Sequence, residues 1–167
     1  MNVKGVESPS SGKIAFGKLL VPIDFSEFSK NALNHAIALA RQFRSELILI
    51  YVVEPTVYPA DLGFGQVTIP NFERELEERG AAGLKELART SVPGELKCRT
   101  LVRTGKPFNE IIRLAEEEHV DLIVIATHGH TGVEHLIFGS TAEKVVKKAP
   151  CPVLMVRAGG RVSDPGN

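Results

Sequence analysis

One stretch of the sequence combines residue types that could bind a phosphate or a metal ion. The segment ATHGHTGVEHLIFGS, residues 126–140, holds three glycines, three histidines and three residues with hydroxyl groups. It follows the apolar run DLIVI and leads into STAEKVVKKA, which is typical of a helix. Backbone N–H groups of a glycine-rich turn can converge on an oxyanion. A helix that begins here would add unpaired amides and the positive end of its dipole, so the order of elements favours a phosphate site.

The same stretch allows two other interpretations. His128, His130 and His135 are close enough in sequence to suggest a metal site, but a structural zinc site usually has four ligands, commonly with sulfur, and no cysteine is near. Alternatively, Ser140 is the N-cap of the following helix and Gly139 a turn residue, since serine is a favoured N-cap. The residues of this segment alone favour a phosphate site and a purely structural N-cap equally.

A second polar group follows the first apolar run of the chain. The segment PIDFS, residues 22–26, carries Asp24, the carboxylate that we expect at a binding cleft. Aspartate is also common at turns and helix caps, so a purely structural role for Asp24 stays open. No Ser–His–Asp arrangement can be recognised in the sequence, which gives no support to nucleophilic catalysis.

The pattern of apolar residues predicts alternating strands and helices. Ser26 is the expected N-cap of the first helix, and Pro107 suits the first turn of the third. Gly80 and Gly83 lower the helix propensity of the second. Strands are predicted within residues 17–26, 45–55, 95–105, 121–127 and 150–157, and helices within 26–43, 71–90, 106–120 and 140–149.

This alternation predicts an α/β domain with a mostly parallel sheet. In such open sheets, ligands bind beyond the carboxyl ends of the strands where the strand order reverses. The polar segments at Asp24 and at residues 126–140 both follow strands. If those two strands are neighbours, the segments face one cleft.

Composition excludes several other classes of protein. Lys plus Arg equals Asp plus Glu at 20 each, so no global field recruits nucleic acid or anionic lipid. Two isolated cysteines fit a reducing cytosol, and neither a signal peptide nor a run of about 20 apolar residues for a membrane span is found. We therefore expect a cytoplasmic protein with one domain over 17–157, a flexible arm over 1–16 and a flexible tail over 158–167.

The sequence from Lys18 to Arg157 resembles the universal stress protein family. The resemblance is carried by LLVPIDFSEFSKNALNHAIALA, LILIYVVE and DLIVIATHGHTGVEHLIFGSTAEKVVKKAPCPVLMVR. The ATP-binding branch of that family has the motif Gly-x2-Gly-x9-Gly-Ser/Thr. Gly129, Gly139 and Ser140 match it, whereas Ala126 replaces the first glycine. Alanine is compatible with that position if its φ is negative.

The resemblance implies a Rossmann-like fold, similar to the adenine nucleotide alpha hydrolases. Its single domain would have an open parallel five-stranded sheet of order 3-2-1-4-5, with helices on both faces. It also implies ATP as ligand, with Mg²⁺ held through the phosphates, and a homodimer formed through the strand Cys151–Arg157. The implied function is a nucleotide-binding module in the stress response.

The resemblance assigns a part of the nucleotide to each site residue. Asp24 would hold the ribose hydroxyls, and the phosphates would lie against the glycine-rich loop and the start of the next helix. The adenine side would be formed by Pro22, Ile23 and Val52, and the phosphate side by Ala126, Thr127, His128, Gly129, His130, Gly139, Ser140 and Thr141.

Two alternatives remain beside this function. In a non-ATP branch of the family the loop is only a turn, and the protein is a dimeric interaction module. In a slow ATPase, phosphoryl transfer would need cationic groups around the phosphates. The loop has no arginine and Lys144 lies one turn into the next helix, so we expect little or no hydrolysis. The connection Thr56–Pro70 could close over the cleft.

Overall fold

The computed structural model describes residues 15–55, 70–128 and 139–157, and of residues 70–72 it describes the backbone alone. Strands and helices alternate along the chain, as the sequence predicts. The predicted arm and tail and the connection over residues 56–69 lie almost wholly outside the described residues. The elements are β1 (Lys18–Pro22), α1 (Glu27–Phe43), β2 (Glu46–Val53), α2 (Pro70–Ser91), β3 (Cys98–Thr104), α3 (Pro107–Glu117), β4 (Leu122–Ala126), α4 (Ser140–Lys148) and β5 (Val153–Val156).

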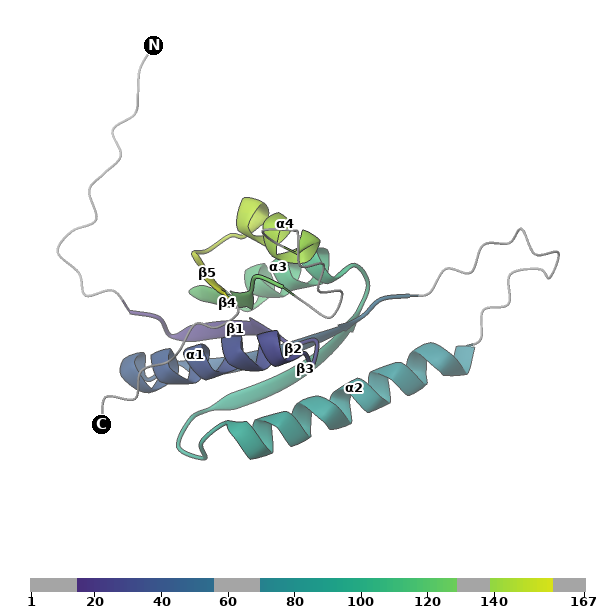
Figure 1. Cartoon of the computed structure of the whole chain (residues 1–167), viewed down its shortest axis with the longest axis horizontal. Helices are drawn as coiled ribbons and strands as arrows, with labels where there is room; N and C mark the ends of the chain where they lie inside the picture. The colour runs from purple at the N-terminus through teal and green to yellow at the C-terminus, as the bar shows by residue number, and fades with distance from the viewer. Residues whose placement is uncertain (1–14, 56–69, 129–138, 158–167) are drawn as a thin grey trace, which may run out of the picture.

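The strands form one five-stranded sheet of order β3-β2-β1-β4-β5. Every neighbouring pair is parallel, and the predicted strand order is confirmed. β1 lies at the centre and pairs with β2 on one side and β4 on the other (Figure 1). The strand order therefore reverses between β1 and β4, which brings the ends of these two strands together.

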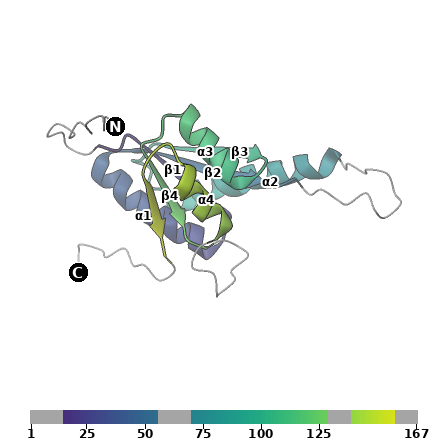
Figure 2. The ribbon, with the colours of Figure 1, turned by 90° about the horizontal axis from the view of Figure 1, so that it is seen from above.

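Helices cover both faces of the sheet. α1 and α2 pack on one face and α3 and α4 on the other (Figure 1), and each face has its own apolar core. Seen from above, α2 reaches well beyond the other helices at its amino-terminal end (Figure 2). Within the described residues, no helix combines the length and apolar character needed to cross a membrane.

α1 has the boundaries and the buried face that its sequence predicts. The Ser26 hydroxyl accepts a hydrogen bond from the backbone N–H of Ser29 at 3.2 Å, which confirms Ser26 as the N-cap. The predicted apolar face is buried, and the helix ends at Arg44 in the left-handed conformation. The spacing i, i+3, i+4 and i+7 in the sequence predicts that face to consist of Leu33, Ala36, Ile37 and Ala40, and all four are buried.

The turn between β1 and α1 contains a residue with an unusual backbone. Phe25 has a φ of 63°, although it is not glycine. Such a conformation is uncommon for a bulky residue and persists only where the surroundings hold it. The Phe25 ring lies 5.0 Å from the ring of Tyr51, and its edge touches α2 at Gly83. α2 therefore packs on an aromatic pair beside the end of β1.

Candidate functional site

A cavity of about 320 Å³ opens at the carboxyl ends of β1, β2 and β4. It lies at the point where the strand order reverses, as expected for an open parallel sheet. Gly129 and His130 lie outside the described residues. Every other predicted site residue lines the cavity: Pro22, Ile23, Asp24, Val52, Ala126, Thr127, His128, Gly139, Ser140 and Thr141.

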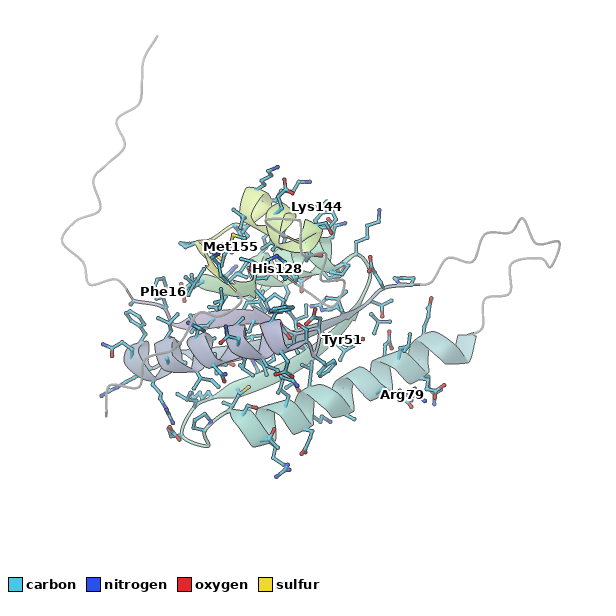
Figure 3. All side chains as sticks on the ribbon, viewed as in Figure 1. Phe16, Tyr51, Arg79, His128, Lys144 and Met155 are labelled. Carbon is cyan, nitrogen blue, oxygen red and sulfur yellow. The ribbon has the colours of Figure 1, made fainter. Side chains whose placement is uncertain are left out.

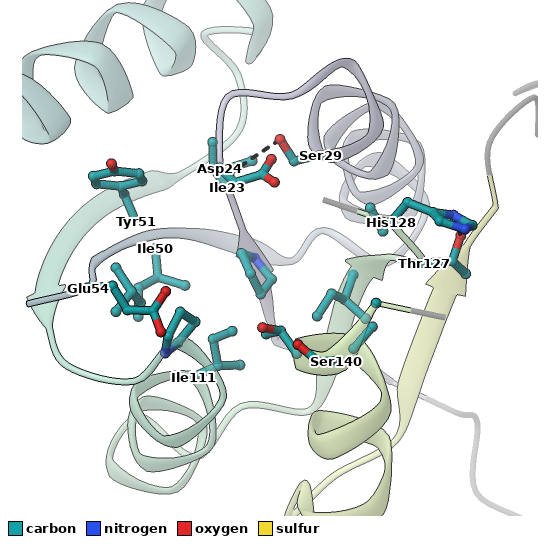
Figure 4. A pocket seen from close by; sticks show the side chains of 18 residues that line it. Ile23, Asp24, Ser29, Ile50, Tyr51, Glu54, Ile111, Thr127, His128 and Ser140 are labelled. Carbon is teal, nitrogen blue, oxygen red and sulfur yellow. Dashed lines mark hydrogen bonds between the residues drawn. The ribbon is translucent and has the colours of Figure 1, made fainter. Parts of the chain in front are cut away.

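Asp24 is held in the turn after β1 and also lines the cavity. Its Oδ1 accepts hydrogen bonds from the backbone N–H of Ser26 at 3.0 Å and from the Ser26 hydroxyl at 2.5 Å. Its own backbone N–H donates to the hydroxyl of Ser29 at 3.4 Å (Figure 4). Ser26 thus holds the carboxylate of Asp24 and Ser29 accepts from its backbone N–H, and the residue also forms part of the cavity wall.

The end of β4 and the start of α4 are tied together at the cavity. The backbone N–H of Gly139 donates to the carbonyl of Thr127 at 2.7 Å, and the N–H of Thr127 donates to the carbonyl of Val156 in β5 at 2.9 Å. The Thr127 side chain is buried, and its hydroxyl lies 2.9 Å from Nδ1 of His128. These contacts aim the first turn of α4 at the cavity.

Gly139, rather than Ser140, is the N-cap of α4. The alternative in which Ser140 serves as the cap is therefore wrong, because Ser140 is already the first helical residue. Glycine has no side chain with which to bond the free N–H groups of the first turn, so the N-cap itself leaves those groups uncapped. The Ser140 and Thr141 side chains stand at the same end of the helix and line the cavity.

Ala126 fits the backbone that the fold requires. It is the last residue of β4, pairs with Val156 and is 7% exposed. Among the described non-glycine residues, positive φ occurs at Phe25, Arg44 and His119, and not at Ala126. The conformational condition for alanine at this position is therefore met.

Several residues line the cavity that the sequence analysis missed. Glu54 follows β2 as Asp24 follows β1, and Pro107 and Ile111 belong to the helix that follows β3. The rule that ligands gather at the carboxyl ends of parallel strands could have identified Glu54. In the view of Figure 4, Asp24 and Ser29 lie above the cavity, and Ile111 and Glu54 below it. The additional residues are Ser29, Ile50, Tyr51, Glu54, Pro107, Ile111, Ile125 and Ala142.

The described residues contain no group of three metal-binding side chains. His130 and His135, on which the metal interpretation depends, lie outside them. The ring of His128 packs 5.8 Å from the ring of Phe28. Both cysteines are free, and burial raises the pKa of the Cys98 and Cys151 thiols, which makes them poor nucleophiles.

The fold and the cavity define a doubly wound α/β protein with a ligand site at its topological switch point. The sequence pattern of the universal stress protein family matches residues 15–157. The chain therefore belongs to the universal stress protein family.

Individual relatives agree with this assignment. Universal stress protein MJ0531 of Methanocaldococcus jannaschii is 36% identical over 150 residues, which cover 88% of this chain and 85% of the relative. The solved structure of MJ0577, from the same organism, has a TM-score of 0.72 at 29% identity and covers 89% of this chain and all of its own.

More distant structures share the fold alone. A universal stress protein in complex with cAMP has a TM-score of 0.59 at 20% identity, covering 86% of this chain and 98% of that one. The protein from Archaeoglobus fulgidus in complex with dAMP has a TM-score of 0.52 at 16% identity, with coverage of 85% and 98%.

Proposed function

We propose that the chain binds an adenine nucleotide, ATP with Mg²⁺, in the cavity at the ends of β1, β2 and β4, and acts as a binding or signalling module in the stress response. The observation that carries the proposal is the junction of β4 and α4, where Gly139 caps the helix without a side chain. Ser140 and Thr141 add hydroxyl groups at the same place. Helix amino termini of this kind are suited to phosphate.

The rest of the cavity suits the other parts of a nucleotide. Asp24 is a rigidly held carboxylate that can accept hydrogen bonds from the ribose hydroxyls. Ile50, Val52 and Ile111 offer apolar surface for a base. The volume of about 320 Å³ lies within the range of about 300–1,000 Å³ that is usual for small-molecule sites. Two proteins of the same fold hold cAMP and dAMP.

Binding rather than catalysis is the proposed activity. Phosphoryl transfer needs cationic groups around the phosphates and a positioned nucleophile. Among the described residues, those that line the cavity include no lysine or arginine. Lys144 instead lies over the Phe108 ring, with Nζ 4.8 Å from the ring centre. We therefore expect at most weak hydrolysis, with Mg²⁺ held through the phosphates.

A homodimer is part of the same proposal. Within the part of the chain that the structure describes, β5 is an edge strand of the sheet and pairs with β4 alone. Leu154 in β5 and Val146 in α4 are 38% and 46% exposed, and they are the large hydrophobic side chains left exposed among the described residues. An open, apolar edge favours pairing with another chain. The segment Cys151–Arg157 is thus the proposed dimer contact, in a protein that we expect in the cytoplasm.

Thermal unfolding with and without Mg·ATP tests the nucleotide site. A ligand at 100 times its dissociation constant stabilises the folded state by about 2.7 kcal/mol. For a chain of this size that corresponds to a rise of roughly 5–10 °C in Tm. We expect a saturable rise that becomes much smaller in Asp24→Ala and is kept in Glu95→Ala, because Glu95 lies at the amino ends of the strands, the end of the sheet opposite the cavity. No rise in the unaltered protein would favour the dimeric interaction module without nucleotide.

A further inference from the structure

We propose that Glu54 determines the base specificity of the cavity by accepting a hydrogen bond from the exocyclic amino group of adenine. The inference rests on the proposed function and extends it to a residue with no assigned role. Glu54 immediately follows β2 and contributes to the cavity wall. It makes no hydrogen bond or ion pair with any other residue that the structure describes.

The pleat of β2 aims Glu54 into the cavity. Side chains two residues apart point to the same face of a strand. Ile50, Val52 and Glu54 follow this spacing, and all three line the cavity. Figure 4 shows Glu54 beside Ile50 on the side of the cavity where Ile111 lies. The carboxylate therefore continues an apolar strip at the point where the strip meets solvent.

The opposite wall is held at a fixed place relative to Glu54. The backbone N–H of Gly105 donates to the carbonyl of Val53 at 2.9 Å, and Gly105 lies two residues before the first residue of α3. This bond joins the end of β2 to the start of α3. Pro107 and Ile111 of that helix form the second apolar surface. A flat ring between the two surfaces would present its edge to Glu54.

The two ends of the cavity are separated by a distance that suits a nucleotide. β2 and β4 lie on opposite sides of β1. Adjacent strands are about 4.8 Å apart, so the ends of β2 and β4 are about 10 Å apart. Glu54 thus stands away from the phosphate end at Thr127 and Ser140, with Asp24 of the central strand between them. The order base, ribose, phosphate follows the order β2, β1, β4.

A carboxylate at the base end selects for a hydrogen-bond donor. An ionised carboxylate only accepts hydrogen bonds, and it would repel a base edge that presents an oxygen or a ring nitrogen lone pair. The amino group of adenine donates. Near the phosphates the same charge would only weaken binding, so its useful partner is on the base.

The test compares Mg·ATP with the Mg complex of purine riboside 5′-triphosphate, which differs only in lacking the amino group. Calorimetric titration of the full chain should give about a 10- to 100-fold preference for ATP, the usual contribution of one hydrogen bond to a charged group. In Glu54→Ala the ratio should fall close to 1, whereas Glu54→Gln, which keeps an acceptor oxygen, should retain part of it. The matched control Glu95→Ala should keep the full ratio.

Repulsion between Glu54 and the phosphates affects both nucleotides equally, because they carry the same charge. The ratio of the two affinities therefore reports the contact with the base alone. If Glu54→Ala keeps the unaltered preference for ATP, the inference is overturned and the nucleotide site stands. Tighter binding of GTP than of ATP by the unaltered protein would also overturn the inference alone. If the unaltered protein binds neither ATP nor the analogue, the proposed function and this inference both fail.

Discussion

The ring of Tyr51 lies directly against the backbone of α2 at Gly80. A Cβ atom at Gly80 would come within 2.4 Å of the ring atom Cδ1, and one at Gly83 would come within 2.9 Å of Cζ of Phe25. Figure 3 shows Tyr51 between the sheet and α2, with Arg79 on the outer side of the helix. Because Tyr51 also lines the cavity, the two glycines seat α2 directly behind the candidate site.

The close contact between Gly80 and Tyr51 predicts that a side chain at position 80 destabilises the protein. Gly80→Ala should lower the free energy of unfolding by about 1–3 kcal/mol, because the methyl group forces the Tyr51 ring or the helix to move. Alanine has a better helix propensity by about 1 kcal/mol, so helix propensity alone predicts the opposite sign. Urea unfolding followed by circular dichroism measures the difference.

Gly94→Ala is the control for this prediction. Gly94 lies in the turn after α2, and a Cβ there would meet nothing within 4 Å. Its substitution should leave stability unchanged within about 0.5 kcal/mol. A stabilised Gly80→Ala protein would show that Tyr51 does not require the close approach.

These glycines illustrate what the sequence could predict of the fold. The apolar runs identified the strands, and Ser26 and Pro107 marked helix starts, because those features depend on neighbours in the chain. Gly80 and Gly83 indicated only a weaker helix. Glycine is needed at both positions because α2 there lies against the rings of Tyr51 and Phe25, and both aromatic residues are far away in sequence.

Ser140→Ala should separate stability from binding. Ser140 is exposed and is not the N-cap of α4, so its loss should change the free energy of unfolding by less than about 0.5 kcal/mol. Affinity for Mg·ATP should fall about 3- to 10-fold, since a hydroxyl donor to phosphate is lost. Ser26→Ala provides the comparison, because Ser26 is a true N-cap and its loss should cost about 1 kcal/mol. A Ser140→Ala protein with unchanged ATP affinity would remove Ser140 from the site.

The carboxylate of Glu118 predicts a pH dependence of stability. Hydrogen bonds from Arg99 at 2.7 Å and, less strongly, from Lys18 at 3.4 Å hold the pKa of Glu118 below its ordinary value. A depressed pKa in the folded state stabilises the protein above the unfolded pKa of about 4.3. The contribution is lost as the pH falls through the folded pKa.

Urea unfolding at pH 7 and pH 3 measures this contribution. Glu118→Gln should be less stable than the unaltered protein at pH 7, by up to about 1 kcal/mol, because the pair is partly exposed. The difference should shrink at pH 3. Glu116→Gln, two residues earlier in the last turn of α3 and without an ion pair to any described residue, should show little difference at either pH. An equal deficit at pH 7 and pH 3 would contradict an ionic origin.

Leu154→Glu should abolish the proposed dimer. A charged side chain on an edge strand opposes pairing with another chain. Light scattering should give twice the 18.1 kDa of one chain for the unaltered protein and a single chain for the variant. Ala82→Glu, on an exposed position of α2, should leave the mass unchanged. A Leu154→Glu protein that remains a dimer would assign the contact to another surface.

The sequence predicted those residues of the candidate site that lie in segments resembling the universal stress protein family. Asp24, Thr127 and Ser140 fall in that group. Ile111 could not be recognised, because it reaches the cavity only through the packing of α3 on the sheet. The helix begins within the predicted range, but its N-cap is Gly139 and not Ser140, so Ser140 is a residue of the first turn that lines the cavity and not a structural cap.

The most direct test of the central claim is a calorimetric titration of nucleotide-free protein with Mg·ATP, alongside Asp24→Ala and Glu95→Ala. We expect saturable binding of about one nucleotide per chain. Affinity should fall about 10-fold or more in Asp24→Ala, since a carboxylate held by Ser26 is lost from the ribose. It should be unchanged in Glu95→Ala. Absence of binding to the unaltered protein, or equal affinity in Asp24→Ala, would contradict the account.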